Sequence, residues 1–178
     1  MSDTRVPPRI IDALDRADDL GEVGRIVRTA ARALTGAMGA TFVLRDDDQC
    51  FYADEDAIAP LWKGQRFPMT TCISGWAMLH ATTAVVPDIE VDPRIPLEAY
   101  RPTFVRSLAM APVGAPDPVA AIGVYWSVPR TPASDAIASL DELAAVTGAA
   151  ISRIGFADAP WAPRFGQGDP GMAAGAIA

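Results

Sequence analysis

The sequence predicts an α+β domain, in which an antiparallel sheet is combined with helices. Apolar residues recur at helical spacing near both ends of the chain, whereas short apolar runs separated by turn residues fill its middle. Half of the 178 residues are hydrophobic, which suffices for a core without disulfides or metal ions. We therefore expect one domain and a terminal extension.

Two helices are expected first. Pro7 and Pro8 suit the start of a helix, because the first turn has no use for the N–H groups that proline lacks. A second helix is predicted from about residue 21 to residue 35, where one apolar stripe recurs at steps of three and four. The stripe consists of Val23, Val27, Ala30 and Leu34. Gly36 or Gly39 is expected to end this helix.

A hairpin and a short helix should follow. Residues 41–44 and 50–52 read as paired strands around a turn of three aspartates at 46–48. Residues 54–66 show no clear pattern, and 67–71 read as a short strand. A helix is then expected over 73–81.

The second half of the chain reads as strands followed by a long helix. Strands are predicted at 84–87, 105–113 and 119–127, with a turn at 114–118. Three prolines exclude a long helix from 88–103, so we expect a structured loop with at most one short helix. Thr131 and Pro132 suit the start of a last helix. Its apolar residues step by three and four, close to a heptad: Ile137, Leu140, Ala144, Thr147, Ile151 and Ile154.

Charge and hydropathy narrow the function classes. The chain carries 22 acidic and 15 basic residues, a net charge of −7, which disfavours binding to nucleic acid or to anionic membranes. No apolar run approaches the roughly 20 residues that span a bilayer. The N-terminus lacks the apolar core of a signal peptide. We therefore expect a cytoplasmic protein in which Cys50 and Cys72 remain thiols.

Residues 69–126 carry the strongest motif: MTTCISGWAMLHATTAVVPDIEVDPRIPLEAYRPTFVRSLAMAPVGAPDPVAAIGVYW. A helix opening with Ile-Ser-Gly-Trp leads to an apolar strand ending in Pro-Asp-Ile. An Asp-Pro-Arg turn, a tyrosine-containing loop and two apolar strands follow. This order resembles the GAF domain, a small sensory fold, and most closely the GAF input domains of bacterial histidine kinases of the HWE type.

The resemblance implies an architecture. In that family an antiparallel sheet of five or six strands carries the terminal helices on one face, and crossover segments on the other face enclose a ligand pocket. Residues 20–156 would form the GAF sensory domain, preceded by an N-terminal helix or extension at 1–19. Residues 157–178, rich in proline, glycine and alanine, would form a flexible tail.

The same segment supplies candidate ligand-binding residues. A pocket needs mostly apolar walls and a few placed polar groups. The predicted set is Cys72, Ser74, Trp76, Asp88, Arg94, Tyr100, Phe104 and Arg106. Cys72 or Ser74 would begin the helix, whose free N–H groups attract anions. Tyr100 and Arg106 follow a proline-rich loop, where functional residues concentrate.

Structural roles compete with ligand contact at several of these positions. The run from Asp92 to Arg94 forms a turn, and Arg94 is equally well explained by pairing with Asp88 or Asp92. Trp76 has the size of a core residue. Cys72 is either a reactive thiol at a helix N-terminus or a small buried apolar residue.

Cofactors and catalysis find little support in the sequence. Some GAF domains attach a bilin through a cysteine beside a histidine, in the loop that here reads PLEAY at 96–100, which has neither residue. We therefore expect no covalent bilin, and the cofactor stays unknown. One histidine, His80, and two separated cysteines build no ordinary metal site. The sequence contains no catalytic motif, and we expect a protein that is not an enzyme.

Three functions remain open. The first is a sensory module that binds a small molecule and signals through its terminal helices, paired in a homodimer, to a histidine kinase or another signalling protein. The second is a ligand-free dimerisation or docking module, whose pocket would be crowded by large side chains: Trp62, Trp76, Phe104, Tyr125 and Trp126. The third is a cysteine-based redox sensor or an enzyme resembling methionine sulfoxide reductases built on this fold.

Overall fold

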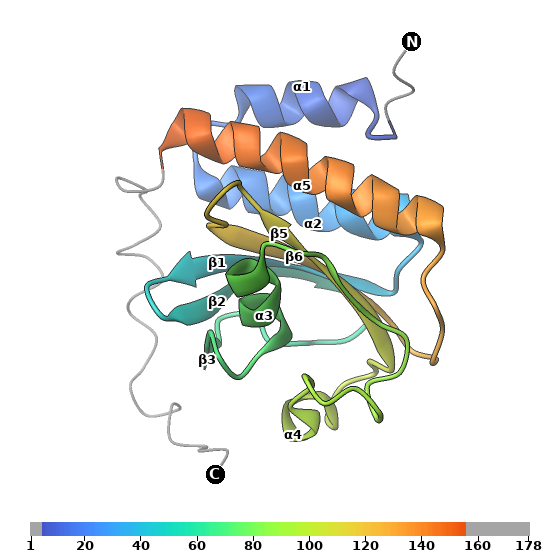
Figure 1. Cartoon of the computed structure of the whole chain (residues 1–178). Helices are drawn as coiled ribbons and strands as arrows, with labels where there is room; N and C mark the ends of the chain where they lie inside the picture. Colours follow the sequence, from blue (N-terminus) through green and yellow to red (C-terminus); the bar gives the residue numbers. More distant parts are fainter. Residues whose placement is uncertain (1–4, 156–178) are drawn as a thin grey trace.

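The computed structural model describes residues 5–155 and contains a six-stranded sheet with helices on both faces (Figure 1). The strand order is β3-β2-β1-β6-β5-β4, and every neighbouring pair is antiparallel. The strands are β1 (Gly39–Asp46), β2 (Gln49–Ala57), β3 (Arg66–Pro68), β4 (Ala84–Val86), β5 (Ser107–Val113) and β6 (Ala120–Trp126). The predicted α+β class is confirmed.

The helices divide between the two faces of the sheet as predicted. One face carries α1 (Pro8–Arg16), α2 (Leu20–Thr35) and α5 (Ser134–Ile154) (Figure 1). The short helices α3 (Ile73–His80) and α4 (Leu97–Tyr100) lie on the other face with the loops around them.

Local signals set the ends of the first two helices. Pro7 is the N-cap of α1 and Pro8 is its first residue, which agrees with the helix start predicted from these two prolines. The Asp19 carboxylate accepts the Glu22 N–H at 2.8 Å, and Glu22 in return accepts the Asp18 N–H at 3.1 Å. Gly36 ends α2 with a φ of 66°, a conformation that favours glycine.

The predicted start of the last helix is wrong by two residues. Helix α5 begins at Ser134, and its N-cap is Ala133, which offers no side-chain cap. The backbone at Ala133 is still extended, with a ψ of 143°, so Thr131 and Pro132 precede the helix. Pro132 is instead buried ahead of the first turn.

Strand β2 extends well beyond the predicted 50–52. Its second half is acidic, and acidic residues are depleted in strands. Two ion pairs with α2 compensate: Arg28 lies 3.2 Å from Asp54, and Arg32 lies 2.7 Å from Asp56. A contact with another element therefore decides the structure of a segment whose own pattern is ambiguous.

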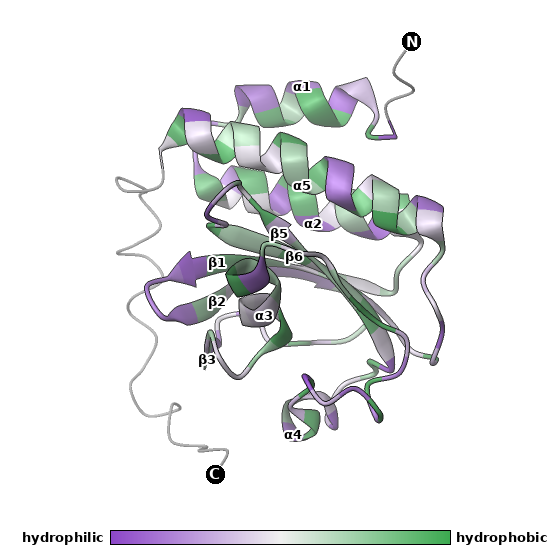
Figure 2. Ribbon diagram, in the orientation of Figure 1, coloured by the Kyte–Doolittle hydropathy of each residue, from purple (hydrophilic) through white to green (hydrophobic). Residues whose placement is uncertain are grey.

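Two separate cores lie on the two faces of the sheet. The core beneath α1, α2 and α5 is mostly aliphatic, with Phe42, Phe51 and Trp126 as its aromatic members. The core beneath α3 and α4 is rich in aromatic and sulfur-containing side chains. Figure 2 shows the hydrophobic strands lying between these two layers.

The apolar stripe of α5 is buried within the chain itself. Leu140, Ala144, Thr147 and Ile151 are all buried in the helical layer. Helix α1 packs on this layer, and Arg153 of α5 donates to the Leu14 carbonyl oxygen at 3.0 Å. A homodimer would therefore use other residues of these helices.

The structure describes the predicted N-terminal extension in part and does not describe the predicted tail. Residues 1–19 include α1, which packs on α2 and α5. The predicted tail from residue 157 lies outside the described residues. Within residues 5–155, no helix has both the length and the apolar character needed to cross a membrane.

Candidate functional site

The start of α3 organises the site. Cys72 is the N-cap residue, with an extended backbone, and Ser74 lies inside the helix. A Cβ at Gly75 would coincide with the Met69 carbonyl group, so glycine permits the close approach of the preceding turn. The buried Ser74 hydroxyl is hydrogen-bonded to the Tyr52 hydroxyl at 3.1 Å and lies 3.3 Å from the Cys72 sulfur.

The two cysteines of the chain meet at this point. Cys50 comes from β2, is fully buried, and places its sulfur 3.2 Å from the Met69 sulfur. A hydrogen bond from Cys50, with further ones from Ser74 and the N–H groups of α3, lowers the pKa of Cys72 to about 7. The same contact with Cys72, together with burial, raises the pKa of Cys50 well above its usual value.

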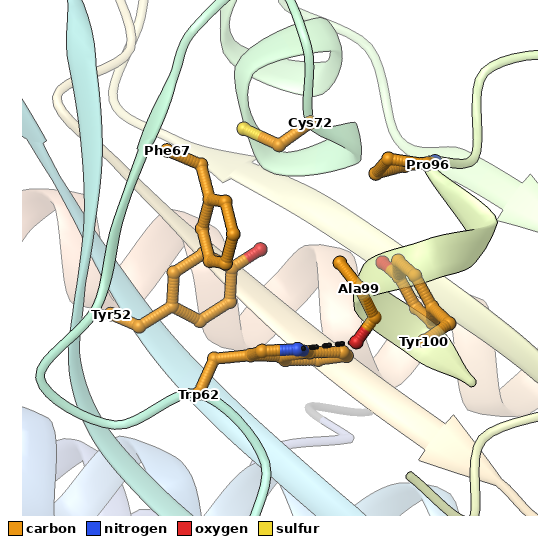
Figure 3. Close-up of a pocket in the computed structure, with 7 residues that line it drawn as sticks. All are labelled: Tyr52, Trp62, Phe67, Cys72, Pro96, Ala99 and Tyr100. Atoms are coloured by element: carbon orange, nitrogen blue, oxygen red, sulfur yellow. Dashed lines mark hydrogen bonds between the residues drawn. The ribbon is translucent and has the colours of Figure 1, made fainter. Parts of the chain in front are cut away.

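Aromatic side chains fill the interior between α3, α4 and the sheet (Figure 3). The remaining cavity measures about 10 Å³, room for one water molecule at most. It is lined by Tyr52, Trp62, Phe67, Cys72, Pro96, Ala99 and Tyr100. The interior is therefore closed to any ordinary metabolite in this conformation.

Trp62 is the central ring of this interior. Its indole N–H donates to the Ala99 carbonyl oxygen at 3.0 Å, and its ring lies edge-on to Tyr100 with centroids 4.8 Å apart (Figure 3). The rings of Tyr52 and Tyr125 pack against it at 5.6 and 5.5 Å. Burial raises the pKa values of all three tyrosines, so their hydroxyls are neutral hydrogen-bonding groups at neutral pH.

A single carboxylate positions the loop that carries Trp62. Glu55, on β2, accepts the backbone N–H groups of Leu61, Trp62 and Lys63 at 2.9–3.0 Å. This arrangement accounts for part of the segment that showed no sequence pattern. Nothing in the local sequence marks Glu55 as the acceptor, since the bonds depend on the chain folding back over β2.

An open groove of about 380 Å³ adjoins the closed interior. It is lined by Thr70, Thr71, Cys72, Trp76, Pro93, Arg94, Ile95 and Pro96, so Cys72 and Pro96 border both spaces. Its size falls within the range of small-molecule sites, and its wall combines apolar surface with threonine hydroxyls and one guanidinium group.

Arg94 and Trp76 form the most structured part of the groove. The Arg94 guanidinium lies 4.5 Å from the centre of a Trp76 ring, on which His80 also stacks at 4.4 Å. Asp92 binds Arg94 through both oxygens, at 3.0 and 2.7 Å. This pairing lowers the pKa of Asp92 and largely balances the arginine charge, so the groove is not a strongly cationic site.

The structure gathers five of the eight predicted residues. Cys72, Trp76 and Arg94 line the groove, and Tyr100 lines the closed interior beside Cys72. Ser74 lies directly beneath Cys72.

The other three predicted residues lie outside both spaces. Asp88 accepts the Glu90 N–H at 2.9 Å within its own loop, and Arg106 donates to the adjacent Val105 carbonyl oxygen. The Phe104 ring packs close to the Gly39 backbone. Asp88 and Arg106 are thus bonded within their own segments, whereas Phe104 contacts β1, and sequence spacing reveals neither arrangement.

Several wall residues were missed by sequence reasoning. Tyr52 and Phe67 come from paired strands earlier in the chain, and Pro93, Ile95 and Pro96 looked like loop residues only. Among residues 5–155, no group of three or more histidine, cysteine or acidic side chains is placed to hold a metal ion.

The sequence matches no protein-family model and no curated protein. Solved structures resemble it closely in shape. The GAF domain of an Acinetobacter phosphoenolpyruvate-protein phosphotransferase superimposes with a TM-score of 0.72 at 14% identity, covering 86% of this chain and 96% of that one. Free methionine-R-sulfoxide reductase from Neisseria meningitidis, solved with its substrate, gives 0.71 at 18% identity, covering 84% and 87%.

A bacteriophytochrome from R. palustris shares the fold over a smaller part of its length. It gives a TM-score of 0.66 at 16% identity, covering 82% of this chain and 36% of that one. At such identities the likeness concerns the fold alone, and the six-stranded sheet with helices on both faces is the fold of the GAF domain.

Proposed function

We propose that this chain is a sensory or regulatory GAF module that binds a small molecule in the groove beside α3. The groove of about 380 Å³ carries the proposal. Structural neighbours that are GAF domains or a phytochrome photosensory module support the sensory role by analogy of fold.

The groove wall suggests the chemistry of the ligand. Ile95, Pro93 and Pro96 provide apolar surface, while Arg94 offers hydrogen-bond donors. The Thr71 hydroxyl donates to the Pro68 carbonyl oxygen, so it faces a ligand as an acceptor. Because Asp92 already pairs with Arg94, a strongly anionic ligand would meet a balanced charge. We therefore propose a small, partly apolar molecule with a few acceptor atoms.

The sheet offers a route from the groove to the terminal helices. Helix α3 packs on β5 and β6, and α5 packs on the opposite face of the same two strands. Ligand binding would shift the helices only by its different affinity for two arrangements. We propose that α2 and α5 carry the signal, in a cytoplasmic homodimer, to a histidine kinase of a two-component system or to another signalling protein.

A docking module is the second candidate. The closed interior favours it, because a cavity of about 10 Å³ holds no ordinary ligand. In this alternative the aromatic interior acts only as a rigid core, and the groove is part of a protein interface.

We propose that the protein is not an enzyme. Its single histidine, His80, stacks on Trp76 and donates its Nδ1–H to the Trp76 carbonyl oxygen at 2.8 Å, within its own helix. The Cys72 side chain interacts with Cys50, Ser74, the Pro68 carbonyl and the N–H groups of α3. This is a setting for thiol chemistry without a neighbouring general base.

A ligand screen tests the proposal. The full-length protein is heated with nucleotides, amino acids, keto acids and small heterocycles, and each compound that raises the Tm is titrated by calorimetry. Binding should weaken at least tenfold in Trp76→Leu and stay unchanged in Leu79→Ala, an exposed position on the same helix. If no compound binds, or if Trp76→Leu binds as well as the wild type, the groove is not the ligand site.

A further inference from the structure

The fold places two cysteines, distant in sequence, against each other. Cys50 lies in β2 and Cys72 precedes α3, and both are free thiols. Each thiol shifts the pKa of the other, and both sulfurs contact the turn formed by Pro68 and Met69. Cys50 also contacts Met69 at 3.2 Å, and Cys72 lies 3.4 Å from the Pro68 carbonyl oxygen. The turn from β3 to α3 therefore holds both sulfurs in one small cluster.

The two thiols differ in character. Cys72 borders the open groove and receives hydrogen bonds from the N–H groups of Ser74 and Gly75, which favour its thiolate. Its pKa of about 7 leaves a large thiolate fraction at neutral pH. Cys50 is fully buried and stays protonated. One sulfur thus favours the thiolate form and borders the groove, and the other lies behind it.

We propose that Cys50 and Cys72 form an oxidisable dithiol, in which a hydroperoxide attacks at Cys72 and Cys50 then closes an intramolecular disulfide. This site is distinct from the ligand proposed for the groove, and either can fail without the other.

The chemistry balances in two steps. The Cys72 thiolate attacks one oxygen of the hydroperoxide, forming an S–O bond while the O–O bond breaks, and the leaving oxygen takes up a proton as an alcohol or water. Cys50 then loses its proton, attacks the Cys72 sulfur and displaces hydroxide, which leaves with that proton as water. Two thiols are oxidised to one disulfide, and one peroxide is reduced.

The disulfide would join β2 directly to the N-terminus of α3. Ser74, which links Cys72 to Tyr52, lies beside this bond. Cys72 would also turn toward β2 and away from the wall that it shares with the groove. Oxidation is therefore expected to change the shape of the groove at the wall that Cys72 forms.

The test uses the full-length reduced protein and hydrogen peroxide in small molar excess. Trypsin cuts after Lys63 and Arg66, so it separates the peptide that holds Cys50 from the peptide that holds Cys72. Mass spectrometry should find these two peptides joined after oxidation and separate again after reduction. Free-thiol titration should show the loss of both thiols together.

Two variants assign the roles. In Cys50→Ser, Cys72 should stop at sulfenic acid, which dimedone traps. In Cys72→Ser, Cys50 should keep its thiol at a peroxide dose that oxidises the wild type. The proposal is overturned if the joined peptides do not form in the wild type, or if Cys72→Ser loses its thiol at the wild-type rate. The wild-type peptide map decides the disulfide even if a variant fails to fold.

Discussion

The two faces of the sheet are built from the same strands but with different side chains. Toward α2 and α5, β5 presents Ala109 and Ala111, and toward α3 it presents Leu108 and Met110. Strand alternation sends neighbouring residues to opposite faces, so β1, β2, β5 and β6 each contribute to both cores. The small residues allow the long helices to approach closely, while the large ones fill the space under the short helices.

The different side chains on the two faces indicate that one face mainly stabilises the fold and that the other carries the candidate site. The helical face is an aliphatic layer with long helices, and no buried titratable group lies in it among the described residues. The opposite face holds three buried tyrosines, both cysteines and the open groove. Truncations in the core of the helical face should therefore lower stability and leave ligand binding and thiol chemistry unchanged, whereas changes on the opposite face should alter binding and thiol chemistry.

The largest effect is expected from truncating the helical core. Leu140 is fully buried on α5, so Leu140→Ala should lower the free energy of unfolding by about 2–5 kcal/mol. Leu79→Ala, at a position 52% exposed, should change it by less than about 0.5 kcal/mol. Urea unfolding measures both. A Leu140→Ala protein that stays folded yet loses ligand affinity would break the separation of the two faces.

The next effect concerns the loop that carries Trp62. Glu55→Ala removes the acceptor of three backbone N–H groups and should cost about 1.5–3 kcal/mol of stability. Trp62 should become more mobile, so tryptophan fluorescence quenching by acrylamide should increase. Glu90→Ala, at an exposed loop residue, serves as the control. Unchanged quenching in Glu55→Ala would show that the aromatic interior holds this loop by itself.

A smaller effect is expected at the groove. Arg94→Lys keeps the charge but loses the two-pronged bond to Asp92 and the bond to the Val85 carbonyl oxygen at 3.2 Å. Stability should fall by about 1 kcal/mol or less, because the pair is partly exposed. Ligand affinity should fall more clearly than stability. If Arg94→Lys matched the wild type in both stability and ligand affinity, the geometry of the arginine side chain would be unimportant here.

The subtlest effect is the pH dependence of Cys72. Its pKa of about 7 predicts that alkylation by iodoacetamide rises with pH through 7 and levels off above it, whereas an ordinary thiol keeps rising toward 9. The hydrogen bond from Cys50 is the main cause of the lowered pKa, so Cys50→Ala should move the midpoint upward. A midpoint near 9 in the wild type would contradict the described environment.

Much of the fold follows from the sequence because its signals are local. The prolines of 88–103, the apolar runs of β5 and β6, and the helical spacing of α2 and α5 each act within one element. The second half of β2 was missed because Asp54 and Asp56 read against a strand, and their arginine partners lie on another element.

The site was predicted only where one segment carries it. Cys72, Trp76 and Arg94 come from the segment around α3 and the loop after β4, and they meet at the groove. Tyr52 reaches the interior through pairing of β2 with β3, which no local pattern specifies. Asp88 and Arg106, also predicted for the site, lie outside both spaces and form hydrogen bonds within their own loops.

Native mass spectrometry of the purified full-length protein tests the central claim most directly. The account predicts a small molecule bound non-covalently, one per chain, either retained through purification or added back from the ligand screen, and lost in Trp76→Leu. A wild-type protein that binds none of the screened compounds and carries none through purification would contradict the sensory proposal and favour the docking module.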